Sequence, residues 1–468
     1  MPSPASSHHQ SRYRLLKTLE QSQREAVASS TMTATCDNYM NAFALHLGAT
    51  PIQMGFLTAV PQFLGSLLQL LSVWLGSFLP RRALVIVAAV LQAALMFCFG
   101  TLAALRGPDL VGPLILLVIL YHACSHLIQP QWRAWMGGLV PQKQRGVFFA
   151  SRTKLTMGTS LAVFLGGGLF LSFSDSLGLS WVGFLFLFLV AMLGRAFSCY
   201  FLASMHDPQP RPATPASGQV LATLRIVREA FSDPVFRNYS LFVAGMQGMV
   251  AISGPFFAVY MLNELQFSYL HYSVNQMVYI ASQFLMLGVW GRLSDKHGNR
   301  YIMLLCSLLM PVVPVLWLFS ANAWYLLLVQ VVSGLAWSGF NLTTANYLYD
   351  IRPHQTNFAS YAAIQAIVTA ALVFVGGLAG GVAAEASDVV AGWLPFDLHS
   401  SLFLVFALSG VLRGAVLFWF IPRAAEPRLR RRSQLLKVVY RVARYNSLGG
   451  IVLDWLTVTE KDKGASGR

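Results

Sequence analysis

The sequence Gly291-Arg-Leu-Ser-Asp-Lys-His-Gly-Asn-Arg300 is a short polar segment, and two long apolar stretches flank it, residues 272–290 and 302–320. An apolar stretch of about 20 residues can cross the hydrocarbon layer of a membrane as a helix. Charged residues and glycines in so short a segment are typical of a turn outside that layer. The segment therefore predicts a charged turn that joins two membrane-spanning helices.

Five residues of this segment are expected to form a latch between the two helices: Gly291, Asp295, Lys296, Gly298 and Arg300. The glycines allow tight backbone geometry. The carboxylate can accept hydrogen bonds from nearby helix amino termini and can pair with the neighbouring cations. The spacing Gly-x-Leu-Ser-Asp-Lys-x-Gly-Asn-Arg resembles the loop between the eighth and ninth helices of major facilitator superfamily transporters. The resemblance implies the fold of that superfamily and carries no information about the substrate.

The composition is that of a membrane protein. Of the 468 residues, 56% are hydrophobic and 11% are charged, with a mean hydropathy of +0.57, which is too apolar for a soluble protein. The formal net charge is +15, but the basic residues gather in alternate connections between apolar stretches, so we expect no nucleic-acid partner. The five cysteines all fall inside apolar stretches, at spacings that fit neither a zinc site nor a redox pair.

Hydropathy predicts twelve membrane-spanning helices. They are expected at residues 25–47, 52–78, 83–105, 112–136, 153–174, 181–203, 238–262, 272–290, 302–320, 324–348, 360–384 and 400–421. Lys and Arg concentrate in every second connection, which predicts that both termini are cytoplasmic and that the protein spans an inner or plasma membrane. The expected fold class is an all-α integral membrane protein with twelve transmembrane helices in two pseudo-symmetric six-helix bundles.

The two halves read as copies of each other, as two-lobed transporters do. Arg195 in the sixth span corresponds to Arg413 in the twelfth. The expected divisions are a cytoplasmic amino-terminal segment 1–24, a first bundle 25–203, a linker 204–237 with an amphipathic helix, a second bundle 238–421 and a basic amphipathic cytoplasmic tail 422–468. The tail is expected to bind anionic lipid.

Asp37 lies near the middle of the first span, where a charged group is costly and therefore needs a partner or a function. It could bind and release a proton during transport, or it could pair with a cationic part of a substrate. The alternative is a structural hydrogen bond between helices.

The fourth span carries several polar and aromatic residues. His122 and His126 are four residues apart and therefore share one helix face, and Gln129 and Trp132 follow. Imidazoles can relay protons, and Gln and Trp can hydrogen-bond or stack on an organic ligand. No Asp or Glu on this helix completes a metal site, so no metal is expected. The alternative is satisfied packing between helices.

Two further pairs complete the candidate residues. The resemblance implies that Asn341 and Asn346 of the tenth span face the central cavity, although such residues also hold helices together. Arg195 and Arg413 are buried charges that we expect to be structural, with an anion site as the alternative. The first-half counterpart of the latch is only Leu79-Pro-Arg-Arg82 and lacks an aspartate, so its cations are expected to pair elsewhere.

The leading hypothesis is a monomeric secondary active transporter of a small organic solute, working by alternating access with proton coupling and without a cofactor. No phosphate-binding Gly-x4-Gly-Lys-Ser/Thr sequence is present, which disfavours a pump that carries its own ATPase. One alternative is a non-transporting sensor or assembly factor on the same fold. Another is a membrane enzyme that uses His122 and His126, although no hydrolase motif supports it.

Overall fold

The computed structural model describes residues 4–76, 78–105, 108–140, 145–207, 228–351, 355–393, 395 and 398–423, and within them it contains helices and no strands. The first half consists of α1 (Pro4–Cys36), α2 (Met40–His46), α3 (Pro51–Leu75), α4 (Arg81–Leu105), α5 (Val111–Leu139), α6 (Arg145–Ser176) and α7 (Ser180–Ser204). The second half consists of α9 (Pro234–Ser253), α10 (Phe256–Val259), a π-helical turn (Tyr260–Glu264), α11 (Tyr269–His297), α12 (Asn299–Leu309), α13 (Val312–Leu316), α14 (Ala323–Ile351), α15 (Gln355–Ala391) and α16 (Leu402–Phe420).

The expected fold class is confirmed: in the described part of the chain, helices lie at all twelve expected spans and pack as two bundles of six. Nine helical spans in the described part of the chain are long and apolar enough to cross a membrane. The other three are α1 with α2, α3 and α11, and they fall short by this measure. Helix α1 packs on α6, α3 packs on α15, and α11 packs on α6 and α14.

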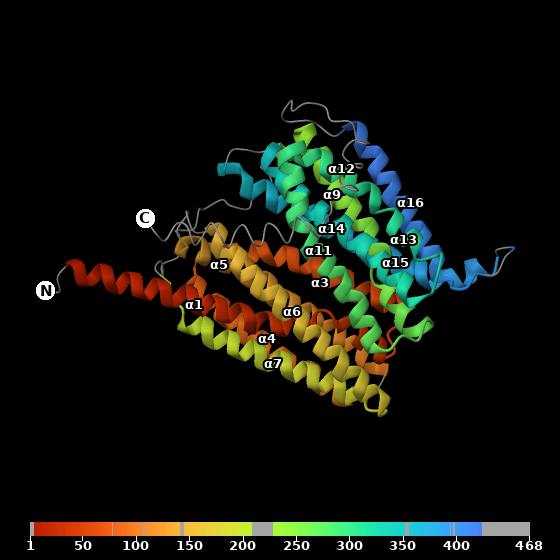
Figure 1. The fold of residues 1–468 in the computed structure, drawn as a ribbon, viewed down its shortest axis with the longest axis horizontal. Coiled ribbons are helices and arrows are strands. Elements are labelled where there is room, and N and C mark those ends of the chain that lie inside the picture. Colours follow the sequence, from red (N-terminus) through yellow and green to blue (C-terminus); the bar gives the residue numbers. More distant parts are fainter. Residues whose placement is uncertain are drawn as a thin grey trace, which may run out of the picture.

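Each bundle is held together by its own helix pairs, and two further pairs join the bundles. In the first bundle α7 packs on α1 and α4, and α5 packs on α3 and α4; in the second, α9 packs on α15 and α16, and α14 packs on α11 and α12. Figure 1 shows α1, α4, α6 and α7 as one group and α9, α12, α13 and α16 as another. The joining pairs are α3 with α15 and α6 with α11.

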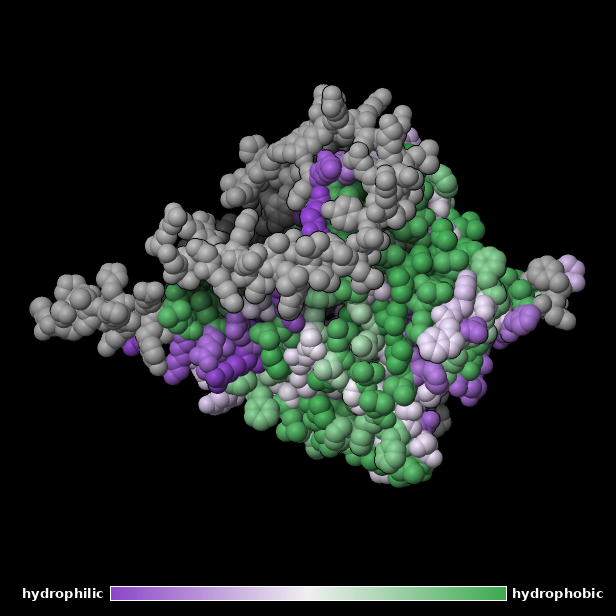
Figure 2. Space-filling model, in the orientation of Figure 1, coloured by the Kyte–Doolittle hydropathy of each residue, from purple (hydrophilic) through white to green (hydrophobic). Residues whose placement is uncertain are grey.

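Hydrophobic side chains cover much of the surface across the helices. Figure 2 shows a broad apolar area over the middle of the visible face, with hydrophilic residues gathered towards its margins. Many large apolar side chains on the helix surfaces are exposed, among them Phe97, Phe173, Phe197 and Phe418. So large an apolar surface would be unusual on a soluble monomer, and it is suited to contact with lipid.

Three of the spans expected as single helices are interrupted. The first breaks between Cys36 and Met40, the seventh at Gly254 and Pro255, and the ninth at Met310 and Pro311. Proline lacks a backbone N–H and clashes with the preceding turn, which accounts for the second and third breaks. The first break contains no proline, and residues within it make contacts with neighbouring helices that are described below.

The expected turn at 291–300 is shorter than the sequence indicates. Helix α11 continues to His297 and α12 begins at Asn299, so Gly298 alone makes the turn. Its φ of +91° is a conformation that favours glycine. The expectation of a ten-residue turn is therefore wrong, because residues 291–297 extend the helix beyond the apolar stretch.

The start of the first helix and the end of the eleventh span also differ from the expected boundaries. Helix α1 begins at Pro4, so the segment expected as 1–24 is largely the first part of the first helix, where Thr18 and Ser22 are buried. Helix α15 continues past 384 to Ala391. The amphipathic part of the linker and the basic tail lie almost wholly in residues 208–227 and 424–468, which are outside the described residues.

Candidate functional site

The two bundles meet through glycines along α3 and α15. A Cβ atom on Gly55 would lie 2.7 Å from the carbonyl oxygen of Gly377, and one on Gly377 would lie 2.7 Å from Cβ of Ala59. A Cβ atom on Gly381 would lie 3.2 Å from Cα of Ile52. Small residues allow such close approach of helix backbones in a membrane. We call this end of the molecule, where α3 begins, the closed end.

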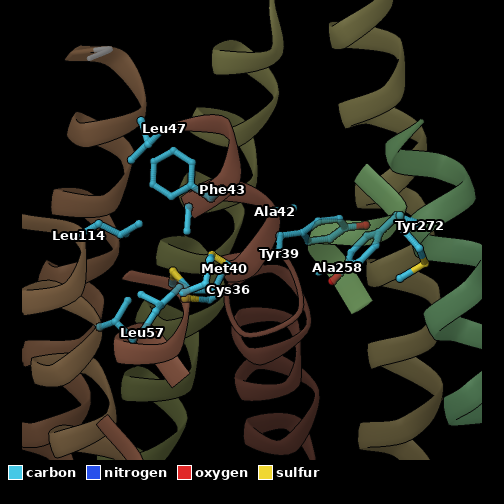
Figure 3. Close-up of a cluster of buried hydrophobic side chains, with 14 of the residues drawn as sticks. Cys36, Tyr39, Met40, Ala42, Phe43, Leu47, Leu57, Leu114, Ala258 and Tyr272 are labelled. Carbon is cyan, nitrogen blue, oxygen red and sulfur yellow. The ribbon is translucent and has the colours of Figure 1, made fainter. Parts of the chain in front are cut away.

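A second set of contacts between the bundles lies at the same end. The Tyr39 hydroxyl is 2.8 Å from Oγ of Ser273 on α11, and it donates to the carbonyl oxygen of Phe164 on α6. The Tyr272 hydroxyl donates to the carbonyl oxygen of Asn38 at 3.2 Å. Figure 3 shows Tyr39 pointing from the break in the first span towards Tyr272. These contacts provide polar partners around residues 37–39, where the helix is interrupted.

Asp37 lines a cavity of about 440 Å³ between α1, α6 and α11. Its side chain is exposed, and the other lining residues include Ser29, Thr33, Thr156 and Ile280. The first three belong to the first bundle and Ile280 to the second, so the cavity lies between the bundles. A carboxylate in this position can bind a solute or a proton that enters the cavity.

A second cavity, of about 350 Å³, lies inside the first bundle beside α1, α5 and α6. It shares Ser29 and Thr33 with the first cavity. With Glu25 and Asp37 these residues are spaced by four along the chain, so they lie on one face of the helix. We call the two cavities together the chamber. Glu25 and Asp37 stand at its two ends, about 18 Å apart at the helical rise.

Glu25 is the centre of a buried polar cluster that the sequence analysis did not identify. Its carboxylate pairs with the Arg152 guanidinium at 2.5 Å and accepts a hydrogen bond from the Ser198 hydroxyl at 3.0 Å. Ser198 in turn accepts a hydrogen bond from Arg195 at 3.0 Å. The guanidinium of Arg152 also lies over the Trp132 ring, 4.5 Å from its centre. The cluster thereby connects α1, α5, α6 and α7.

The predicted residues of the fourth span separate into two groups. Gln129 and Trp132 line the 350 Å³ cavity. His122 and His126 line neither cavity: His122 contacts the Tyr121 ring, and Nδ1 of His126 is 2.9 Å from the Gln69 amide nitrogen on α3. The structure therefore places His126 in a helix-to-helix contact, and a transport role for both histidines stays a prediction.

The tenth-span residues are not brought to the chamber. Asn341 is exposed and Asn346 is half-buried, and neither lines the two cavities. Their expected position opposite Asp37 was implied by the family resemblance, and their role in binding stays a prediction.

The predicted latch is only partly described. Lys296 is exposed, Gly291 accepts a hydrogen bond from the Ser294 hydroxyl through its carbonyl oxygen, and Arg300 lies at the start of α12. The Asp295 side chain is outside the described side chains. In the first half, Arg81 forms a bidentate pair with Asp207, with a shortest distance of 2.6 Å. The first-half cation thus pairs with the end of the sixth span, as expected from the lack of an aspartate in its own loop.

The contacts of Arg413 favour the structural role expected for it, which stays a prediction. It is 2% exposed, and it donates to the carbonyl oxygen of Met310 at 3.0 Å and to the Ser253 hydroxyl at 2.7 Å. Met310 would normally accept from the residue four positions later, but that residue is Pro314, which has no N–H. Arg413 therefore supplies the donor that the ninth span lacks, and it ties together the breaks of the seventh and ninth spans.

The replacement Arg413→Leu is expected to destabilise the protein. It leaves the buried Met310 carbonyl without the Arg413 donor, which costs about 1–3 kcal/mol, whereas the Ser253 hydroxyl keeps its hydrogen bond to Ser409. The midpoint of thermal unfolding in detergent should fall by several degrees, whereas Arg423→Leu, at an exposed arginine, should change it little. An unchanged midpoint, together with altered anion dependence of transport, would instead favour the anion-site reading of Arg413.

Among the described residues, no group of three or more His, Cys, Asp and Glu side chains could hold a metal ion. The polar groups that face the chamber are carboxylates, guanidiniums, amides and hydroxyls, together with the Trp132 indole. Such groups can bind and orient a polar solute.

Comparisons with known proteins agree with this architecture. The model of the Major Facilitator Superfamily matches residues 27–257 and again 246–457. No curated protein sequence matches the chain. Among solved structures, a bacterial homologue of the iron transporter ferroportin, in an inward-facing state, is similar with a TM-score of 0.68 and 12% identity, covering 88% of this chain and 99% of that one.

Two other solved structures show the same fold. The D-xylose-proton symporter has a TM-score of 0.66 and 14% identity, covering 88% of this chain and 98% of that one. A mutant of the nucleoside transporter NupG has a TM-score of 0.64 and 14% identity, covering 86% of this chain and 100% of that one. At these identities the similarity establishes the fold, and the solutes of those proteins are not transferred to this chain.

Proposed function

Because the chain belongs to the Major Facilitator Superfamily, we propose that it is a secondary active transporter that moves a small organic solute by alternating access. The observation that carries the proposal is the chamber, which opens along one face of α1 while the bundles are packed together at the closed end. Rocking of one bundle against the other around such a site would expose it to each side in turn. The family and its structural relatives indicate a transporter rather than an enzyme.

The closed end is the outer end in this proposal. The basic residues Arg81, Arg82, Lys296 and Arg300 lie at the opposite end of the spans, and cytoplasmic connections carry the excess of Lys and Arg. The structure then corresponds to an inward-facing state in a cell membrane, with both termini in the cytoplasm. The basic tail would bind anionic lipid, and the transporter would act as a monomer.

Proton coupling is assigned to Asp37. Its carboxylate is exposed to the cavity, and the adjacent residues Asn38 and Tyr39 contact Tyr272 and Ser273 of the second bundle. Protonation of Asp37 would change the charge directly beside the contacts that separate when the closed end opens. A two-state element of this kind is what links ion binding to a conformational change.

The latch residues Gly291, Asp295, Lys296, Gly298 and Arg300 are proposed to stabilise the opposite, outward-facing state from the cytoplasmic side. Gly298 makes the turn between α11 and α12, and α11 also carries Tyr272 and Ser273 at its other end. Helix α11 would therefore connect the latch at one end of the molecule with the closed end at the other.

Uptake into proteoliposomes tests the proposal. The purified full-length protein is reconstituted, and radiolabelled sugars, nucleosides, amino acids and organic acids are supplied with and without an inwardly directed proton gradient. We expect one class to accumulate, and to do so more with the gradient. If no solute moves with or without the gradient, the non-transporting alternative would replace this proposal.

A further inference from the structure

The wall of the 350 Å³ cavity has an excess of positive charge. Three guanidinium groups line it, those of Arg133, Arg152 and Arg195, together with the Glu25 carboxylate. Glu25 pairs with Arg152, and no ion pair is found for Arg133 or Arg195 among the described residues. Charges interact more strongly in a membrane protein interior than in water. The wall therefore favours a solute that carries negative charge.

Two hydrogen-bond donors in the same wall have no partner. The buried Nε atoms of Trp132 and Arg195 form no hydrogen bond, and Arg195 is only 5% exposed. Buried polar atoms nearly always have partners. The Gln92 carbonyl oxygen, which is also unpartnered, suits a hydroxyl or N–H group of the same solute. These three atoms are themselves buried, so a solute reaches them only when their side chains turn towards the cavity, and the charge of the wall carries the argument.

The rest of the lining combines apolar and uncharged polar side chains, the polar ones being Ser29, Thr33, Ser125 and Gln129. Met32, Ile128 and Trp132 contribute hydrocarbon and aromatic surface, and Arg152 already stacks on the Trp132 ring. The cavity volume is at the lower end of the range for small-molecule sites, about 300–1,000 Å³. A compact organic group beside an anionic group fits these surfaces.

We propose that this cavity binds the carboxylate or phosphate group of an organic anion, and that this group competes with Glu25 for Arg152. The proposal rests on the proposed function, because it names the chemical class of the solute. Guanidinium groups bind carboxylate and phosphate oxygens in pairs of parallel hydrogen bonds. The Glu25 carboxylate holds Arg152 while the site is empty, and the solute takes over that interaction. Asp37 lies at the other end of the chamber, about 18 Å from Glu25 at the helical rise, so it repels an anion held at Arg152 less strongly than the neighbouring guanidinium groups attract it.

Thermal stabilisation of the purified full-length protein by four matched probes tests the proposal. Benzoate and phenyl phosphate are the anions, and benzyl alcohol and benzylamine are the neutral and cationic counterparts. We expect at least one anion to raise the unfolding midpoint by about 2 °C or more at millimolar concentration. The two anions differ in their group, so their comparison separates carboxylate from phosphate. Equal stabilisation by all four probes, or none by either anion, would overturn the proposal.

Variants separate binding from structure. Arg133→Gln removes an exposed guanidinium that forms no ion pair with the described residues, so it should fold normally and weaken anion binding roughly tenfold. Arg24→Gln, which removes an exposed arginine paired with Glu20 outside the cavity, should leave binding unchanged. Glu25→Gln removes the competing carboxylate and should tighten anion binding several-fold. Weaker anion binding by Glu25→Gln, or equal binding by the Arg133 and Arg24 variants, would contradict the proposal.

The failure of this proposal is distinguishable from the failure of the proposed function. If a neutral or cationic solute is transported and Arg133→Gln does not affect its uptake, the transporter stands and the anion site is wrong. If anions bind as expected and no solute moves in proteoliposomes, the binding site stands and transport is wrong.

Discussion

Gly168→Val is expected to abolish transport, whereas Gly166→Val, two residues earlier on α6, is expected to leave it largely intact. A Cβ atom at position 168 would lie 2.6 Å from Cβ of Ser273 and 3.0 Å from the Tyr39 hydroxyl. A Cβ atom at position 166 would meet nothing within 4 Å. Overpacking costs about 1–3 kcal/mol, and about 1.4 kcal/mol changes a population tenfold. Uptake by the Gly168 variant should therefore fall by roughly tenfold or more.

The reason for the loss can be measured separately. In a variant whose native cysteines are replaced, Ala59→Cys places a thiol against Gly377 at the closed end. Gly168→Val should increase its labelling by a water-soluble thiol reagent, because the bundles no longer close there. Gly377→Val, in the other joining helix pair, should give the same two results. Equal uptake by the Gly168 and Gly166 variants would show that this end does not need to close during transport.

The sequence predicts the spans well because the bilayer imposes their length and their apolar character. Two of the three helix breaks coincide with Pro255 and Pro311, but Pro61 and Pro130 stand inside the unbroken helices α3 and α5, so a proline in a span does not by itself predict a break. The break at residues 37–39 was not, because it depends on partners from α6 and α11 that are distant in sequence. The local sequence does not indicate such contacts.

The site was only partly predictable for a related reason. Asp37, Gln129 and Trp132 were identified, since polar groups within an apolar stretch stand out. Glu25 lies at the edge of the first expected span and Arg152 just outside the fifth, so both looked like groups at the membrane surface. Their pairing appears only when α1 and α6 pack together. The spacing of four from Glu25 to Asp37 was the one available signal for a shared polar face.

The arginines show that buried charge alone does not reveal a role. Arg195 and Arg413 occupy corresponding positions in the two halves. Of the two, Arg195 lines one of the two described cavities, and its partner Ser198 donates to the Glu25 carboxylate. Arg413 instead donates to the Met310 carbonyl, which lacks the N–H of Pro314. The symmetry of the halves thus predicts the position of each arginine and does not predict its partners.

Asp37→Asn is expected to abolish proton-driven accumulation of the solute while solute exchange across the membrane continues. Asn keeps the shape of the protonated side chain and cannot release a proton, so the gradient no longer drives net uptake. In proteoliposomes the variant should equilibrate labelled solute to the same level with and without a proton gradient. Asp109→Asn, at an exposed carboxylate outside the chamber, should retain accumulation.

The accumulation and exchange assays together decide whether Asp37 couples proton movement to transport or only binds the solute. If Asp37 only held a cationic part of the solute, the variant would weaken exchange and accumulation alike, because both require binding. If it carries the proton, exchange survives and accumulation is lost, since the bundles can still rock with a permanently neutral side chain beside Tyr39 and Asn38. Accumulation at the wild-type level would remove Asp37 from the mechanism. The coupling role would then pass to another carboxylate of the chamber, and Glu25, which already exchanges partners in the anion-site proposal, is the one that the geometry offers.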